Sequence, residues 1–261
     1  MAWQQTPHES IWCVCSDGSL QALTLNLEQQ VLAWRRHSLG GAVESVAVIP
    51  SPDGRRDDVW LIIRRLINGM EQRYVEVLAP EHEPGEDQAL AIYANSALTY
   101  DGAPTLTLNG LDHLEGEVIR LKTDGAAHPD RTVTGGGVTL ARSASRVVAG
   151  LAAPYGAQLM PLEAGATLGT AQGRAKRIHR LTARLLESLG GRFGPAPGAC
   201  DPLQYRRPGS GMDAAPALWT GDLIQTFPGG YDGAATIALE GDDVFPFTLI
   251  ALFPEMATHE G

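Results

Sequence analysis

The chain has 261 residues, a length that fits one large β domain or two smaller ones. Its 44% hydrophobic and 19% charged residues are typical of an ordinary globular protein, and its 30 glycines and 17 prolines indicate frequent turns and few long helices. The formal net charge of −10 argues against a protein that wraps nucleic acid, because that binding needs Lys and Arg clustered against phosphates.

The cysteines and the amino terminus add further exclusions. Three cysteines do not make a disulfide framework, so we expect synthesis in a reducing compartment. Cys13 and Cys15 would share one face of a strand, which favours a structural role over a metal site. The start "MAWQQTPHES" lacks the features of a secretory signal, and no apolar run approaches the roughly 20 residues of a membrane helix. We therefore expect no membrane insertion.

Residues 11–79 read as strands separated by short turns. Asp17-Gly18 lies between two apolar stretches and predicts a hairpin, because both residues accept left-handed turn conformations. Asn68-Gly69 predicts a second hairpin with a two-residue loop. Its register would pair Ile63 with Tyr74, Ile62 with Val75, Trp60 with Val77 and Arg64 with Arg73.

These strands are predicted to form one antiparallel sheet that resembles a blade of a β-propeller, with Trp12, Trp34 and Trp60 on successive strands. A single blade cannot bury both of its faces. The sheet must therefore pack against further blades or another sheet.

Residues 80–89, "PEHEPGEDQA", read as a linker or long loop in which His82 is solvated. From Leu98 to Leu151 short strands return, separated by Asp124-Gly125 and a run of three glycines, and predict a small barrel or sandwich. We therefore divide the chain into a blade-like sheet over 1–95, a small β barrel or sandwich over 96–150, and a C-terminal β segment over 151–261. The fold class predicted for the whole chain is all-β.

The third segment holds an ambiguous stretch, "KRIHRLTARLLESLGG". Ile178, Leu181, Leu185 and Leu189 fit helical spacing, whereas Leu181, Ala183 and Leu185 fit a strand. Periodicity alone slightly favours the helix. A proline-rich arm with little regular structure follows, and "AATIALEG" and "FPFTLIALFPEM" predict two closing strands.

The densest group of acid and base side chains is "NGLDHLEGEV", residues 109–118. On a strand Asp112 and His113 would point to opposite faces, and His113 with Glu115 supplies only two of the roughly three ligands that a hydrolytic metal needs. We therefore favour a turn that Leu111 and Leu114 anchor, with its polar groups in water.

Searches for a Walker loop, a dinucleotide fingerprint, a nucleophile elbow and a zinc-protease motif find none. "RAKRIHR" at 174–180 is the one basic cluster, and on an acidic chain it reads as a solvated strand or helix face. No catalytic, cofactor-binding or metal-binding residue is assigned. No cofactor is expected, and the chain is not predicted to be an enzyme.

Six segments, taken together, resemble phage tail proteins of the nozzle (tail tubular protein B) kind, found in short-tailed phages and prophages. The segments begin at Ile11, Glu44, Asp57, Gly110, Gly169 and Met212, and the similarity continues to "DDVFPFTLIALFPE" near the end. Members of the family are longer, with the rest of the propeller before the position of Met1. The resemblance thus implies either a fragment or a short variant whose remaining blades come from another polypeptide.

The resemblance implies a structural part of a virion tail, made in the cytoplasm of the bacterial host. It would be a homo-oligomeric ring subunit, usually in six copies, that contacts other tail and adaptor proteins while DNA passes as cargo. An acidic channel would not retain that DNA. The resemblance also favours a strand over 177–187.

Two other functions remain open at this stage. A glycan-binding module or tail adhesin is the alternative, because "FPGGYDG" and "LWTGD" place aromatic rings beside carboxylates. An enzyme built on Asp112, His113 and Glu115 ranks third.

Overall fold

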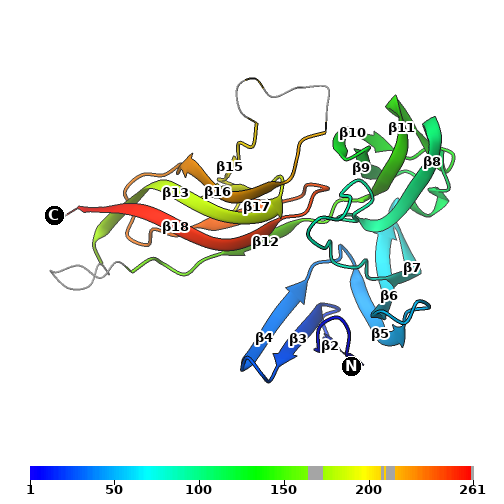
Figure 1. The fold of residues 1–261 in the computed structure, drawn as a ribbon, viewed down its shortest axis with the longest axis horizontal. Coiled ribbons are helices and arrows are strands. Elements are labelled where there is room, and N and C mark those ends of the chain that lie inside the picture. The colour runs from blue at the N-terminus through cyan, green and yellow to red at the C-terminus, as the bar shows by residue number, and fades with distance from the viewer. Residues whose placement is uncertain (164–172, 207–208, 210–214, 260–261) are drawn as a thin grey trace. The chain divides into compact units, whose positions relative to one another are not determined.

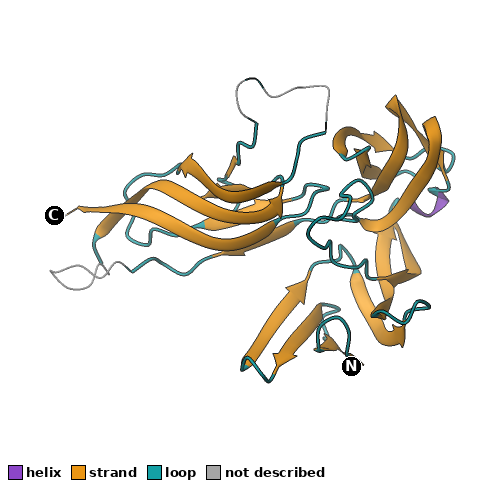
Figure 2. Ribbon diagram, viewed as in Figure 1, coloured by secondary structure: helices purple, strands orange, loops and turns teal. Residues whose placement is uncertain are grey.

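The computed structural model describes residues 1–163, 173–206, 209 and 215–259. Strands supply nearly all of its regular structure, and one helical turn, η1 (Asp112–Leu114), interrupts them within the described residues (Figure 2). The mainly-β fold is therefore confirmed. The chain forms two compact units, of which the first comprises Met1–Glu81, Ala94–Asp124 and His128–Ala153, and the second comprises His82–Tyr93, Gly125–Ala127 and Pro154–Gly261.

The first unit begins with an antiparallel four-stranded sheet (Figure 1). Its strands follow chain order: β1 (Ala2–Gln4), β2 (Ser10–Val14), β3 (Leu20–Asn26) and β4 (Val31–His37). The hairpin predicted at Asp17-Gly18 joins β2 to β3, with Gly18 at a φ of 80°. The Asp17 carboxylate accepts hydrogen bonds from the backbone and hydroxyl of Ser19, which fixes the turn.

A second, three-stranded sheet contains the other predicted hairpin. Its strands are β5 (Ala42–Pro50), β6 (Asp57–Ile67) and β7 (Met70–Val77), with β6 in the centre. Asn68 and Gly69 have φ values of 47° and 77°, the left-handed conformations of a two-residue loop. The predicted register is confirmed at each of its four pairs, from Trp60 and Val77 to Arg64 and Arg73.

The single blade-like sheet predicted for this region is wrong in its extent. The strands divide between two sheets because β5 pairs with β6 and not with β4. Each sheet buries one face against the other. The shared core is formed by Trp12, Leu20 and Ala22 from the first sheet and by Val43, Val59, Leu61 and Ile63 from the second.

A third sheet completes the first unit. It has the order β10-β9-β11-β8, from β8 (Asn95–Asn109), β9 (Val118–Thr123), β10 (Ala126–Thr132) and β11 (Gly137–Leu151). The barrel or sandwich of about five strands predicted here is thus a single sheet of four. Its buried residues include Leu111, Leu114, Ile119 and Val147, and Ile67 at the end of β6 joins the same core.

The second unit contains two sheets. One has the order β12-β17-β14-β15, from β12 (Tyr155–Gln158), β14 (Arg192–Gly194), β15 (Asp201–Pro202) and β17 (Ala238–Gly241). The other has the order β16-β13-β18, from β13 (Ala175–Ser188), β16 (Trp219–Thr226) and β18 (Thr248–His259). The proline-rich arm predicted before β16 falls partly at 207–208 and 210–214, outside the described residues.

The ambiguous stretch in this unit is the long central strand β13. Leu181, Ala183 and Leu185 are buried in alternation with Arg180, Thr182 and Arg184. The strand is confirmed, and the slight preference of periodicity for a helix is wrong. Pairing with β16 on one side and β18 on the other satisfies the backbone of β13, so tertiary contacts decide its conformation.

Candidate functional site

The segment "NGLDHLEGEV" forms a structural turn around η1. Leu111 and Leu114 are fully buried, so the predicted anchors are confirmed. Tyr74 donates a hydrogen bond of 2.9 Å from its hydroxyl to the His113 carbonyl, and the Asn68 amide donates one of 2.6 Å to Glu117. The turn therefore attaches the third sheet to the end of the β6–β7 hairpin.

The acidic and basic side chains of this turn bind separate backbone groups. Glu115 accepts hydrogen bonds from the amides of Gly136 and Gly135 at 2.8 and 2.9 Å, and these bonds hold the pKa of its carboxyl below the ordinary value. The Nε2 atom of His113 lies 3.0 Å from the Ser96 carbonyl oxygen. The expectation that all these polar groups face only water is wrong, because they fix neighbouring loops.

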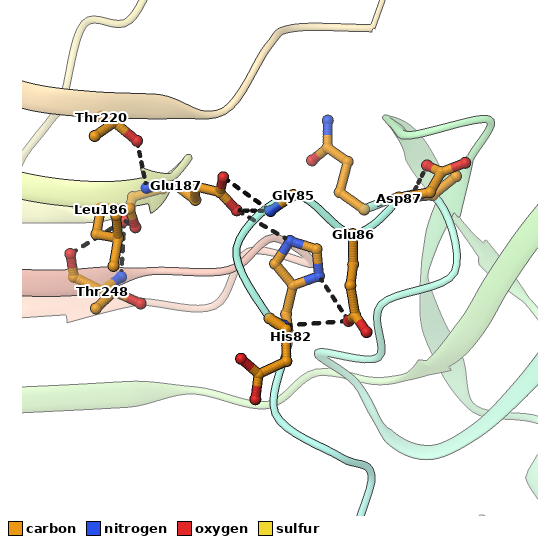
Figure 3. Close-up of polar contacts among 12 residues, drawn as sticks. His82, Gly85, Glu86, Asp87, Leu186, Glu187, Thr220 and Thr248 are labelled. Atoms are coloured by element: carbon orange, nitrogen blue, oxygen red, sulfur yellow. Dashed lines mark hydrogen bonds and ion pairs between the residues drawn. The ribbon is translucent and has the colours of Figure 1, made fainter.

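The prediction that His82 is solvated is also wrong, because its side chain is only 4% exposed. Its Nε2 lies 3.5 Å from Glu187 and its Nδ1 lies 3.9 Å from Glu86 (Figure 3). Glu187 also accepts hydrogen bonds from the Gly85 amide at 3.2 and 3.3 Å. An imidazole that activates a nucleophile directs one nitrogen toward it, whereas both nitrogens here face carboxylates. The cluster is suited to attaching the loop at 82–86 to the end of β13.

Three side chains of the basic cluster at 174–180 have local partners. Arg180 and His179 lie 3.2 and 3.4 Å from the carboxylate of Glu255, and the ammonium group of Lys176 is buried and donates to the Leu162 carbonyl. This arrangement agrees with an exposed strand face rather than a basic patch.

The part of the chain that the structure describes holds no cluster of metal-binding side chains. No three His, Cys, Asp or Glu side chains gather there closely enough to hold an ion. Cys13 and Cys15 are free thiols. Within the same described ranges, no helix has the length and apolar character of a membrane span.

The aromatic residues proposed for glycan binding are not brought into one exposed platform. Trp219, the first residue of β16, packs against the core of the second unit. Tyr231 is exposed, and the neighbouring Asp232 pairs through its backbone with Lys176.

A hollow that the sequence did not indicate lies on the β12-β17-β14-β15 sheet. It has a volume of about 530 Å³, and Gly156, Gln158, Arg192, Glu240 and Asp242 contribute to its lining. Arg192 donates to Asp242 at 2.9 Å. Tyr155 also lines the hollow, and burial raises the pKa of its hydroxyl. Carboxylates, a guanidinium and an aromatic ring are groups that bind sugar hydroxyls and rings.

The first unit also exposes apolar residues on the sheet faces that point away from its core. On the β1–β4 sheet, the register places Trp3, Ile11, Leu23 and Trp34 in one row across all four strands. Leu25 and Leu32 form the next row. Trp3 and Trp34 are 62% and 61% exposed. We call these six residues the four-strand outer face.

The β5–β7 sheet has an equivalent surface. Ala47, Trp60 and Val77 form one row, and Ser45, Ile62 and Val75 form the next. Val75 is 69% exposed, and Trp60, Ile62 and Val77 are also exposed. We call these six residues the three-strand outer face. Antiparallel sheets with one solvated face normally carry polar residues there, so two apolar outer faces indicate surfaces for contact.

The sequence analysis identified the tryptophans but not the sheet face on which each side chain lies. Trp12 pairs with Ala22 and points into the core, whereas Trp34 pairs with Leu23 and points outward. Only the cross-strand register, in which adjacent residues alternate between faces, distinguishes them.

Sequence comparison with protein families and curated proteins finds no relative. No protein-family model matches the chain, and no curated protein is significantly similar to it in sequence. The resemblance to tail nozzle proteins therefore stays a prediction.

Proposed function

We propose that this protein is a structural component of a phage tail, a nozzle-like or tube-like ring subunit that acts by protein–protein assembly. The observation that carries the proposal is the pair of apolar outer faces in the first unit, with Trp3, Trp34 and Trp60 exposed on them. Aromatic residues on apolar patches are typical of protein interfaces. The order and spacing of the six similar segments favour a tail over other assemblies.

The net charge of −10 is compatible with a ring through which DNA passes, because carboxylates at a channel wall repel phosphates. In this role the partners are further copies of the chain and neighbouring tail and adaptor proteins.

The experiment that tests this function is mass spectrometry of phage-like particles sedimented from the source cells after DNA damage. We expect peptides of this chain in the particle fraction, at a copy number similar to that of other tail proteins. Particles that contain the other tail proteins but lack this chain would overturn the proposal.

A glycan-binding module is the second candidate, and the hollow at Gly156 favours it. Gly156 lies opposite Glu240 on β17, and Glu240 lies opposite Arg192 on β14, so a side chain at position 156 would enter the hollow. A glycan array should then give a hit that Gly156→Val abolishes. An array without a hit would exclude this candidate for the sugars tested.

A further inference from the structure

Strand β10 lies at the edge of the third sheet and buries one residue, His128. The other six residues of the strand, which include Pro129, are exposed or partly exposed, whereas His128 is 7% exposed. In the sheet order β10-β9-β11-β8, β10 has β9 on one side only. Proteins normally cover an edge strand or attach it to another element. The contacts of His128 therefore matter for how the other side of β10 is held.

The imidazole of His128 accepts a hydrogen bond from β11, a strand that is not next to β10 in the sheet. The Ala141 amide donates to Nε2 at 2.7 Å, and Nδ1 lies 2.7 Å from the Pro129 carbonyl oxygen. A backbone amide only donates and a carbonyl only accepts. The ring is therefore neutral, with its proton on Nδ1 and a lone pair on Nε2.

Ala141 lies where the backbone pairing of β11 is interrupted. The register between β11 and β8 shifts between Thr139 and Ala144, so the amide of Ala141 lies within the irregular part of the strand. Such irregularities leave ladder groups unpaired and bend the strand. The His128 imidazole here takes the place that a strand carbonyl would have in a regular ladder.

A second proton on His128 is incompatible with this contact. It would occupy Nε2 and face the N–H of Ala141, so two donors would oppose each other. Arg131 makes another link between the same strands, from its Nε to the Thr139 carbonyl at 3.1 Å. The guanidinium keeps its charge at any ordinary pH, so this link does not depend on acid.

The charges around His128 also oppose its protonation. Burial lowers the pKa of the ring below 6.5, the Pro129 carbonyl offsets part of that shift, and the cations Arg131 and Arg142 add to it. Asp130, the carboxylate of β10, pairs with an arginine of β9 at 3.0 Å. The neutral ring is thus the form that the closed structure favours.

We propose that His128 is an acid-sensitive latch that releases β10 from the Ala141 amide of β11 when the ring takes up a second proton. Above pH 6.5 the closed form keeps its full advantage. Below pH 6.5 the opened ring binds a proton that the closed ring does not, so the equilibrium constant for opening rises by up to about tenfold per pH unit. This behaviour belongs to the third sheet and does not depend on the proposed function.

Amide hydrogen exchange of the full chain, resolved at Ala141 by NMR, tests the latch. Between about pH 7 and about pH 5 most carboxylates keep their charge. After correction for the intrinsic exchange rate, we expect the protection of the Ala141 amide to fall with pH by up to about tenfold per unit. Constant protection across this range would overturn the proposal.

His128→Gln separates the latch from a general effect of acid. The side-chain carbonyl of glutamine accepts a hydrogen bond and does not titrate, so Ala141 should keep its protection in this variant as the pH falls. Circular dichroism checks that the variant is folded. The same acid-dependent loss of protection in His128→Gln as in the unsubstituted protein would contradict the latch.

His113→Gln is the matched control. The Nε2 of His113 lies 3.0 Å from the Ser96 carbonyl oxygen, so this ring donates and a second proton leaves its bond in place. The variant should show the same acid-dependent loss of protection at Ala141 as the unsubstituted protein. Loss of the pH dependence in His113→Gln would show that His128 is not the group that responds.

A further measurement needs no variant. Long-range ¹H–¹⁵N NMR spectra of the unsubstituted protein report which nitrogen of each imidazole carries the proton. Above pH 6.5 we expect the His128 proton on Nδ1 and none on Nε2. A proton on Nε2 would exclude the bond from Ala141 and overturn the proposal, whether or not His128→Gln folds.

Discussion

At the scale of single residues, His37 is held in an environment that opposes its charge. Its ring packs against Trp12 with centroids 4.8 Å apart, and its Nε2 is buried without a hydrogen-bond partner among the described residues. Burial, followed by the nearby charge of Arg35, lowers the pKa of His37 from 6.5 to about 4.

This shift predicts a pH-dependent stability. Between pH 6.5 and about 4 the unfolded chain binds a proton at this position that the folded chain does not. The neutral His37 ring therefore contributes fully to the free energy of unfolding above pH 6.5. As the pH falls toward 4, this contribution is lost at up to about 1.4 kcal/mol per pH unit. Urea unfolding across this range should show a shallower decline for His37→Phe. An unchanged slope would mean that other groups cause the decline.

A second prediction at this scale concerns Glu76, which makes two hydrogen bonds of 2.8 Å to the buried guanidinium of Arg65. Burial alone would raise the pKa of Glu76, but hydrogen bonds from Arg65 and Ser96 outweigh it and hold the pKa below 4.5. Glu76→Gln removes the countercharge and should lower the free energy of unfolding by about 3 to 5 kcal/mol.

The control is Glu71→Gln on the same strand, where Glu71 pairs with Arg64 at the surface. Measured by urea unfolding, Glu71→Gln should lower the free energy of unfolding by less than about 1 kcal/mol. Equal losses for the two variants would show that the Arg65–Glu76 pair is not effectively buried.

At the scale of elements, the β6–β7 hairpin could be predicted to the residue because its determinants are local. Asn68 and Gly69 fix the loop, and the loop length fixes the register. Division of the strands into two sheets could not be predicted, since the pairing of β5 depends on which faces bury each other. The same dependence on distant partners made β13 ambiguous, because Leu181 and Leu185 fit both periodicities.

Gly69→Ala tests the local origin of that hairpin. No atom lies within 4 Å of the position that a Cβ would take, so the cost is backbone strain at a φ of 77°. We expect the free energy of unfolding, measured by heat or urea, to fall by about 1 to 2 kcal/mol. Gly18→Ala, whose Cβ would meet the Cβ of Ala42 at 2.8 Å and its Cα at 3.1 Å and whose φ is 80°, should cost more. Equal costs would contradict this distinction between strain and collision.

At the scale of the whole molecule, the candidate site was only partly accessible to sequence reasoning. The sequence shows tryptophans on successive strands, but the face on which each one lies follows from the assembled core, as Trp12 and Trp34 show. The hollow at Gly156 depends on three strands distant in sequence and had no local signal.

The last prediction concerns the net charge of −10 that each copy carries into an apolar contact. Copies of like charge repel one another at long range. Raising ionic strength from about 10 mM to about 150 mM shortens the screening length from roughly 30 to roughly 8 Å. Association should therefore strengthen with salt, seen as a higher average sedimentation coefficient at fixed protein concentration. Weaker association at higher salt would mean that ion pairs, rather than the apolar rows, hold the copies together.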